Sequence, residues 1–194
     1  MKKLVTTIAL LCFCSTRAMA INTHKDWVPG IDDISGFGCG SISNFGQSVK
    51  VPVSKHTIGS FSFYLQKWSG FSGTGVVRGE IYRWDPKTHR PAEPAIFESK
   101  PRTLAFGDSN FHRVTFHPNV SVTPGAQYLV FLTTDRDNEC AGNPYFQWGG
   151  VDGSTYAGGS FYFLSAGGDP SNWEMHSWDT YSGFDAAFVV TLPN

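Results

Sequence analysis

The feature that most constrains the fold of this chain is an alternation of apolar and polar side chains with a period of two. Phe61, Phe63 and Leu65 alternate with Ser, Tyr and Gln, and a second alternating run extends over residues 184–192. Successive side chains of a strand point to opposite faces, so this period predicts strands with one buried face. Further strands are expected at 46–53, 76–84, 94–99, 113–116, 127–133, 144–148 and 160–164.

Turn residues separate these predicted strands. Thr123-Pro124-Gly125 and Gly167-Gly168-Asp169-Pro170 combine a proline, which presets φ, with glycines that accept positive φ. The chain is rich in aromatic residues, Val, Ser and Thr, which favour pleated, half-buried surfaces, and no segment has convincing helical spacing. About nine strands with regular turns predict an all-β fold, an antiparallel β-sandwich of the jelly-roll type.

Residues 1–20 predict a cleavable secretory signal. Lys2 and Lys3 precede an apolar run over 4–14, and Ala18-Met19-Ala20 has the small-x-small pattern that signal peptidase prefers. The apolar run is shorter than the roughly 20 residues that a membrane-spanning helix needs, so no membrane span is predicted. We therefore expect one domain over 21–194 in a secreted protein, periplasmic or extracellular.

Charge bears on the kind of partner that the domain can bind, and cysteine content bears on disulfide formation. The chain has 15 Lys and Arg against 16 Asp and Glu, and three of the basic residues lie within 1–20. The mature domain is therefore acidic, which argues against a nucleic-acid partner. Cys39 and Cys140 remain after cleavage, and an even pair in an oxidising compartment predicts a disulfide bond, with two buried thiols as the alternative.

Several segments resemble a group of secreted bacterial β-sandwich proteins. The resemblance is carried by Gly46-Gln47-Ser48-Val49, by the segments 58–65 and 77–85, by Tyr156-Ala157-Gly158-Gly159 and by Trp178-Asp179. Members of that group are largely uncharacterised, and some resemble galactose-binding-like or carbohydrate-binding modules. Several members carry a C-terminal sorting tail, whereas this sequence ends directly after its last predicted strand. The resemblance implies a galactose-binding-like sandwich and does not imply a site.

An aromatic stretch near the C-terminus is the candidate ligand site. Sugars present C–H faces to aromatic rings, while amide, imidazole and carboxylate groups bond their hydroxyls. Trp173, Trp178 and Tyr181 would stack on a glycan, and Asn172, His176 and Asp179 would bond its hydroxyl groups. The alternative for Trp178 is packing over one end of the sandwich core.

A calcium site is the second candidate. Asp135, Asp137 and Glu139 crowd carboxylate oxygens directly after a predicted strand, which is the ligand chemistry of Ca²⁺. The segment lacks the spacing of an EF-hand loop, so a solvated acidic turn is the competing interpretation. No other cofactor is expected.

An enzymatic role finds less support than binding. The sequence has neither a GxSxG nucleophile motif nor an HExxH zinc motif. Glu80 and Glu98 are the pair that a small glycoside hydrolase could use, although strand alternation favours solvent-facing acids at both positions. The leading hypothesis is a non-catalytic sandwich that binds extracellular or cell-surface carbohydrate. The alternatives are a glycosidase and a structural or adhesive envelope protein, and the sequence does not specify the oligomeric state.

Overall fold

The computed structural model describes residues 18–38, 41–71, 73–137, 145–153, 155–167 and 169–193. Within these ranges nearly all regular structure is β, with one 3₁₀ turn, η1 (His24–Asp26), and one short helix, α1 (Asn172–Met175). The strands are β1 (Met19–Asn22), β2 (Asp33–Phe37), β3 (Asn44–Lys50), β4 (Thr57–Ile58), β5 (Ser60–Lys67), β6 (Gly75–Asp85), β7 (Arg90–Glu98), β8 (Arg102–Leu104), β9 (His112–Phe116), β10 (Val120–Ser121), β11 (Gln127–Thr133), β12 (Phe146–Asp152), β13 (Phe161–Leu164), β14 (Asp179–Thr180), β15 (Phe184–Ala186) and β16 (Phe188–Leu192).

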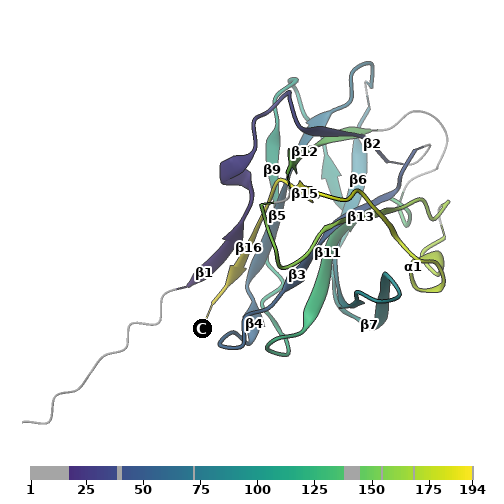
Figure 1. Ribbon diagram of the computed structural model, residues 1–194. Coiled ribbons are helices and arrows are strands. Elements are labelled where there is room, and N and C mark those ends of the chain that lie inside the picture. The colour runs from purple at the N-terminus through teal and green to yellow at the C-terminus, as the bar shows by residue number, and fades with distance from the viewer. Residues whose placement is uncertain are drawn as a thin grey trace, which may run out of the picture.

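The strands form two antiparallel sheets that pack face to face as a β-sandwich, which confirms the predicted class (Figure 1). The first sheet has the order β1-β16-β5-β12-β15, with β9 on β5 and β2 on β12. The second has the order β14-β13-β3-β11-β6-β7, with β8 on β6, and β4 pairs separately with β10. The jelly-roll and galactose-binding-like assignments stay predictions.

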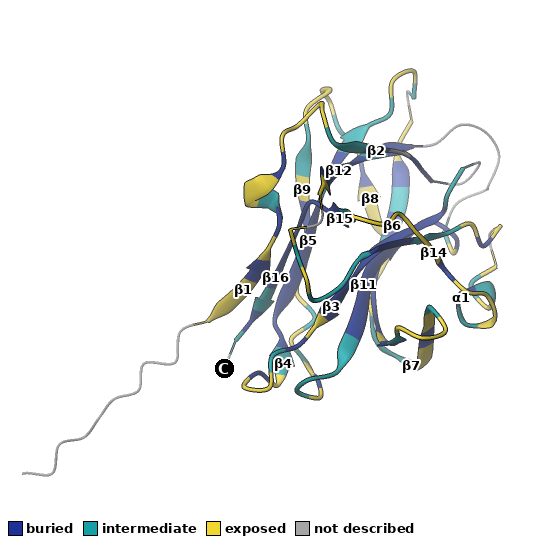
Figure 2. Ribbon diagram, viewed as in Figure 1, coloured by how far each residue is buried: buried dark blue, intermediate teal, exposed yellow. Residues whose placement is uncertain are grey.

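The alternating residues of the sequence form the core between the sheets. Phe61, Phe63 and Leu65 of β5 have no exposed surface, and they face Phe45 and Val49 of β3 in one hydrophobic cluster. Figure 2 shows this burial along the centres of both sheets, with exposure concentrated in the connecting loops. The period of two therefore assigned the inner face of these strands correctly.

Each sheet also buries a smaller cluster on its outer face. On the first sheet, Trp27 covers Val151 and Ala187, beside the half-buried Tyr64 and Phe111. On the second, side chains of β6, β11 and β13 pack against the segment that contains α1. The buried members of this cluster are Tyr82, Trp84, Leu129, Phe131, Tyr162, Ala166, Trp173 and Trp178. Only part of each outer face is covered, and the uncovered parts hold the hollows described below.

The last alternating run is divided between two neighbours. Residues 184–192 were expected to form one strand, but β15 ends at Ala186 and β16 begins at Phe188. β15 pairs with β12, whereas β16 pairs with β5 and β1, and the backbone N–H of Ala187 donates to the carbonyl of Gly149 at 2.8 Å. The helix α1 is a second difference, because its single turn is too short for sequence periodicity to reveal.

A buried polar bridge joins the two sheets. The Gln47 side chain of β3 donates to Asp185 Oδ1 at 2.8 Å and accepts from the backbone N–H of Ala186 at 2.9 Å. Asp185 Oδ2 also accepts the backbone N–H of Tyr156 at 3.0 Å. The buried Asp185 carboxylate thus satisfies backbone and amide donors, which is the common role of an aspartate at the end of a strand.

The first and last strands that the structure describes pair at one edge of the first sheet. β1 pairs with β16, and Met19 and Ala20, which fall within the predicted signal segment, lie opposite Leu192 and Thr191. The predicted signal otherwise lies outside the described residues, so cleavage after Ala20 stays a prediction. No helix among the described residues is long and apolar enough to cross a membrane.

Candidate functional site

The aromatic stretch predicted to bind sugar is largely committed to packing. Trp173 and Trp178 are 0% and 1% exposed, and their rings meet Phe131 edge-on at centroid distances of 5.2 and 5.1 Å. The indole N–H of Trp178 donates to the backbone carbonyl of Trp173, and that of Trp173 donates to Asp135. A ring with no exposed face cannot stack on a sugar, so the prediction for these two residues is wrong in this structure.

The other four residues of that candidate site are engaged differently. Asn172 donates its side-chain amide to the carbonyl of Ala166 at 2.9 Å. His176 and Asp179 are exposed. Tyr181 is half exposed and stacks on Phe163 at 4.8 Å. The stretch therefore packs α1 onto the second sheet, and it does not present the predicted stacking platform.

The predicted calcium ligands have other partners. Asp137 accepts two hydrogen bonds from the Arg78 guanidinium, at 2.6 and 2.9 Å, which holds the pKa of its carboxyl below the usual value. The buried Asp135 accepts from Asn44 at 2.7 Å and from Trp173 at 3.0 Å. Glu139 and the predicted disulfide cysteines, Cys39 and Cys140, lie outside the described residues. Within the described ranges no cluster of three His, Cys, Asp or Glu could hold a metal.

The two carboxylates of the glycosidase alternative lie on neighbouring strands, but one of them is fully buried. Glu80 lies opposite Glu98 in the β6–β7 register, so both side chains project from the same face. Glu98 is exposed and pairs with Arg78 at 2.8 Å and Arg136 at 3.3 Å. Glu80 has no exposed surface, so the expectation that it faces solvent is wrong. A substrate has no access to its carboxyl group in this structure.

Burial changes the acidity of Glu80. Loss of hydration, reinforced by the charge of Glu98 and opposed by Arg136 and Arg78, raises the pKa of Glu80 from 4.5 to about 8. Neither of its carboxyl oxygens has a hydrogen-bond partner within the described part of the chain. At neutral pH this group is protonated and enclosed, which suits neither a nucleophile nor a base.

Two adjoining hollows on the outer face of the first sheet bring together a different set of residues. One has a volume of about 680 Å³ and the other about 530 Å³, and both are lined by Gln66, Ser109 and Gln147. We call their union the aromatic groove and define it by the following lining residues: Trp27, Asp33, Tyr64, Gln66, Trp68, Phe71, Ser109, Phe111 and Gln147.

Strand register builds the centre of this groove. Tyr64 and Gln66 alternate with the buried Phe63 and Leu65 along β5, so both project from the outer face. Gln147 of β12 lies directly opposite Gln66 in the antiparallel register. Opposed residues of neighbouring strands have Cβ atoms about 5 Å apart, so two carboxamides stand side by side between the aromatic residues.

Packed rings form one end of the groove. His24 stacks on Tyr64 at a centroid distance of 3.9 Å, and Phe111 meets Trp27 edge-on at 4.7 Å. Trp27 is 7% exposed, whereas Tyr64 and Phe111 are half-buried and present part of their rings to the hollow. Burial and the nearby Arg113 charge lower the pKa of His24, which favours the neutral ring.

Asp33 fixes this end of the groove. Its carboxylate accepts the indole N–H of Trp27 at 3.2 Å, the Gln147 amide at 3.3 Å and the backbone N–H of Gly30 at 3.0 Å. Loss of hydration raises the pKa of Asp33 above its usual value, although the bonds from Trp27 and Gly30 oppose that shift. Asp33 thus orients one ring and one amide at the surface that a ligand would touch.

Gln66 and Trp68 are less constrained. The Gln66 side chain has no hydrogen bond to another described residue, so its amide can both donate to and accept from a ligand. Trp68 is half-buried just beyond β5, where its backbone N–H donates to Tyr145 and its carbonyl accepts from Phe71. The Phe71 ring packs on Tyr145 at 4.9 Å, which supports the second end of the groove.

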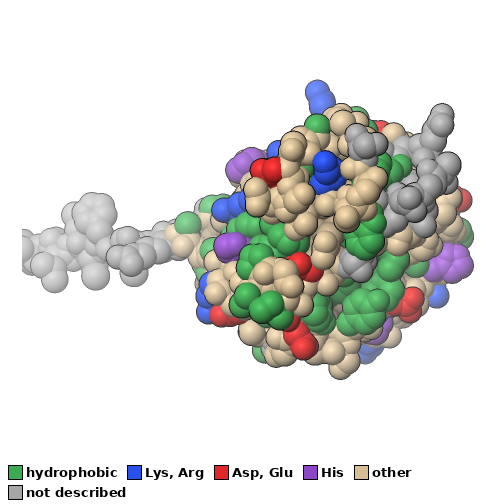
Figure 3. Space-filling model, turned by 90° about the horizontal axis from the view of Figure 1, so that it is seen from above, with side chains coloured by type: hydrophobic (Ala, Val, Ile, Leu, Met, Phe, Trp, Pro, Cys, Tyr) green, Lys and Arg blue, Asp and Glu red, His purple; other side chains and the backbone are tan. Residues whose placement is uncertain are grey.

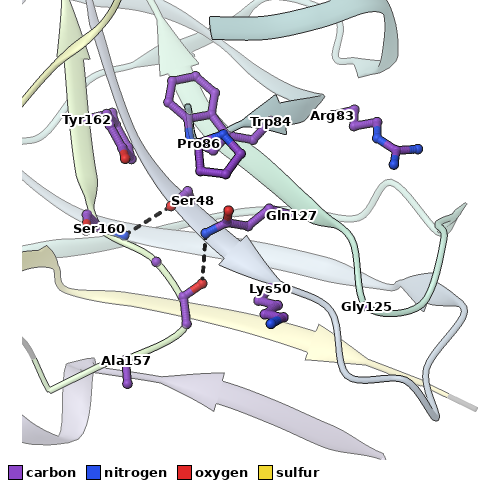
Figure 4. A pocket seen from close by; sticks show the side chains of 12 residues that line it. Ser48, Lys50, Arg83, Trp84, Pro86, Gly125, Gln127, Ala157, Ser160 and Tyr162 are labelled. Carbon is purple, nitrogen blue, oxygen red and sulfur yellow. Dashed lines mark hydrogen bonds between the residues drawn. The ribbon is translucent and has the colours of Figure 1, made fainter. Parts of the chain in front are cut away.

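A further hollow of about 570 Å³ lies on the opposite side of the sandwich, on the outer face of the second sheet (Figure 4). Its aromatic lining residues, Trp84 and Tyr162, are 3% and 6% exposed. Gln127 donates to the carbonyl of Gly158, and Arg83 extends away from the other labelled side chains in Figure 4. This hollow offers less exposed ring surface than the aromatic groove, where Tyr64, Trp68 and Phe111 are half-buried.

One face of the molecule carries charged side chains of both signs. On the face seen from above, Lys and Arg are scattered among Asp, Glu and uncharged side chains (Figure 3).

Signals for the aromatic groove were present in the sequence, in the alternation of Tyr64 and Gln66 and in Trp68 before a turn. The pairing with Gln147 was not predictable because it depends on strand order.

Comparisons of the chain with protein-family models, with curated proteins and with solved structures found no match.

Proposed function

We propose that this chain is a secreted, non-catalytic β-sandwich protein that binds extracellular or cell-surface carbohydrate in the aromatic groove. The observation that carries this proposal is the meeting of half-buried rings with a directly opposed pair of glutamines, Gln66 and Gln147, in one hollow. Rings accept the apolar C–H faces of sugars, and carboxamides both donate to and accept from hydroxyl groups.

The groove has the volume of a binding site, and some of its lining residues are held in place before a ligand binds. Each of its two hollows falls within the roughly 300–1,000 Å³ range of small-molecule sites. Asp33 holds Trp27 and Gln147 in place before any ligand arrives, which reduces the entropy lost on binding. Secretion rests on the signal predicted over residues 1–20, and it would place the groove where glycans occur, in the periplasm or outside the cell.

Binding is favoured over hydrolysis by the state of the carboxylates. Glycoside hydrolysis needs a pair of accessible carboxyl groups on either side of the scissile bond. Asp33 accepts three hydrogen bonds and serves to position its neighbours. Glu80 is enclosed and Glu98 is tied to two arginines. A glycan-binding role requires no step from any of these groups.

The test is retention of the purified protein on a panel of immobilised plant, fungal and bacterial polysaccharides. We expect wild-type protein to be retained by at least one of them, and Gln66→Ala and Tyr64→Ala to be retained less. Lys50→Ala is the matched control, since Lys50 is exposed in the opposite hollow, and it should behave as wild type.

Gln66→Ala removes a half-buried amide without opening the core, so it separates binding from folding if Tyr64→Ala proves unstable. Retention of both groove variants at the wild-type level would contradict the proposal. So would loss of retention in Lys50→Ala alone, or no retention of the wild type on any polysaccharide.

A further inference from the structure

The two hollows of the aromatic groove adjoin at three shared lining residues. Gln66, Ser109 and Gln147 line both of them, so these side chains lie where one hollow borders the other. Each hollow alone has the volume of a small-ligand site. Their union therefore has room for more than one ligand unit.

The type of lining side chain changes in a regular order from one end of the aromatic groove to the other. Tyr64 and Phe111 place ring surface at one end, the two glutamine amides occupy the middle, and Trp68 and Phe71 place ring surface at the other end. Tyr64 and Trp68 lie four positions apart in the sequence, which corresponds to about 13 Å along an extended strand. One pyranose ring is shorter than this span and cannot contact both ends.

We infer that the groove binds an internal stretch of an unbranched oligosaccharide, with at least three consecutive sugars along β5. The outer two sugars pack against Tyr64 and Trp68, and the middle sugar bonds through its hydroxyls to Gln66 and Gln147. This inference rests on the proposed function and specifies its ligand class. A single terminal sugar would leave one of the two aromatic ends unused.

The environment of Trp68 supports the inference that one sugar packs against its ring. Trp68 is half-buried and its backbone is anchored by Tyr145 and Phe71, yet its side chain belongs to none of the three buried clusters. A large ring held at the end of a polar groove provides apolar area to a ligand at little cost in side-chain entropy. Trp68→Ala should therefore change ligand binding without unfolding the protein.

The inference is tested by calorimetric titration with cello-, xylo-, chito- and galacto-oligosaccharides, each from the monosaccharide to the hexasaccharide. For the series that binds, the wild-type affinity should rise by about tenfold or more between monosaccharide and trisaccharide and then level off. Trp68→Ala should lose about tenfold for the trisaccharide and longer chains and little for the monosaccharide. Trp68→Phe should recover part of that loss.

Near-ultraviolet circular dichroism of each variant checks that the fold is retained. A monosaccharide that binds as tightly as the trisaccharide, or Trp68→Ala with wild-type affinity at every length, would overturn the extended-chain inference and leave carbohydrate binding in place. No binding of any oligosaccharide in the four series would overturn this inference, and no retention on the polysaccharide panel would also overturn the proposed function.

Discussion

Glu80 lies directly opposite Glu98 on neighbouring strands, yet the two carboxyl groups occupy opposite electrostatic environments. Glu98 is exposed and paired with Arg78 and Arg136, while Glu80 is fully buried with no hydrogen-bond partner within the described residues. The arginines compensate the charge of Glu98, whereas loss of hydration, reinforced by the negative charge of Glu98, keeps the proton on Glu80. The pair is a structural feature that couples stability to pH.

The first prediction follows from the pKa of Glu80. The unfolded chain loses this proton near pH 4.5, whereas the folded protein keeps it until about pH 8. The free energy of unfolding should therefore fall as pH rises across this window, because the unfolded state is the more easily ionised. Glu80→Gln resembles the protonated acid, so it should match wild type in acid and exceed it above pH 8.

Urea denaturation across this pH range measures the effect. Glu98→Gln serves as the comparison, since removing the neighbouring negative charge lowers the pKa of folded Glu80. The loss of stability should still begin near pH 4.5 in that variant, but it should end at a lower pH and be smaller in total. If Glu80→Gln kept the same pH dependence as the wild type, Glu80 would not be the responsible group.

The second prediction concerns Trp173. Replacing this buried ring by alanine leaves a cavity beside Phe131 and removes the donor that Asp135 accepts, so Trp173→Ala should cost about 3–5 kcal/mol in the free energy of unfolding. Trp173→Phe keeps most of the packing and should cost less. Chemical denaturation gives both values, and glycan binding by the folded Trp173→Phe variant should equal that of wild type. If the folded Trp173→Phe variant lost glycan binding, Trp173 would belong to the ligand site.

The third prediction concerns the bridge between the sheets. Gln47→Ala leaves the backbone N–H of Ala186 and one oxygen of Asp185 without the partner that both use. A buried polar group that loses its partner costs about 1–3 kcal/mol, so the variant should be destabilised by this amount or more. Thermal unfolding compared with Gln127→Ala, a matched glutamine of the second sheet's outer face, measures it. Equal melting temperatures for the two variants would refute the role of the bridge.

The fourth prediction concerns Asp33. Its protonation removes an acceptor that holds Trp27 and Gln147, so glycan affinity should fall as the solution is acidified. Because burial raises the pKa of Asp33, the fall should begin at a higher pH than for an exposed aspartate. Titration calorimetry over a pH series measures this, and Asp33→Asn should show weaker binding that no longer depends on pH in this range. An unchanged acid limb in Asp33→Asn would assign the effect elsewhere.

The sequence predicted the strands where one face is strongly apolar. Alternation over 61–65 placed β5, because burial of one face selects the register. The segment 127–133 was also expected as a strand and forms β11. The prediction merged β15 with β16, since Ala186 and Phe188 continue the alternation although they face different partner strands. Residue pattern alone does not contain this change of partner.

The candidate site was harder to predict than the fold. Trp173 and Trp178 lie in a polar, turn-rich stretch, which suggested exposure, but Phe131 and Tyr82 on the outer face of the second sheet provide an apolar surface that buries them. That surface arises from β6 and β11, strands distant in sequence. Likewise Gln66 and Gln147 are 81 positions apart and meet only through β5–β12 pairing.

The most direct test is to observe the side-chain signals of the groove while an oligosaccharide binds. Two-dimensional ¹H–¹⁵N NMR resolves the carboxamides of Gln66, Gln147 and Gln127 and the indole of Trp68. On titration with the tightest-binding member of the four oligosaccharide series, the signals of Gln66, Gln147 and Trp68 should shift together while that of Gln127 stays fixed. A shift of Gln127 with the groove signals unmoved, or no shift with any of these sugars, would contradict carbohydrate binding in the aromatic groove.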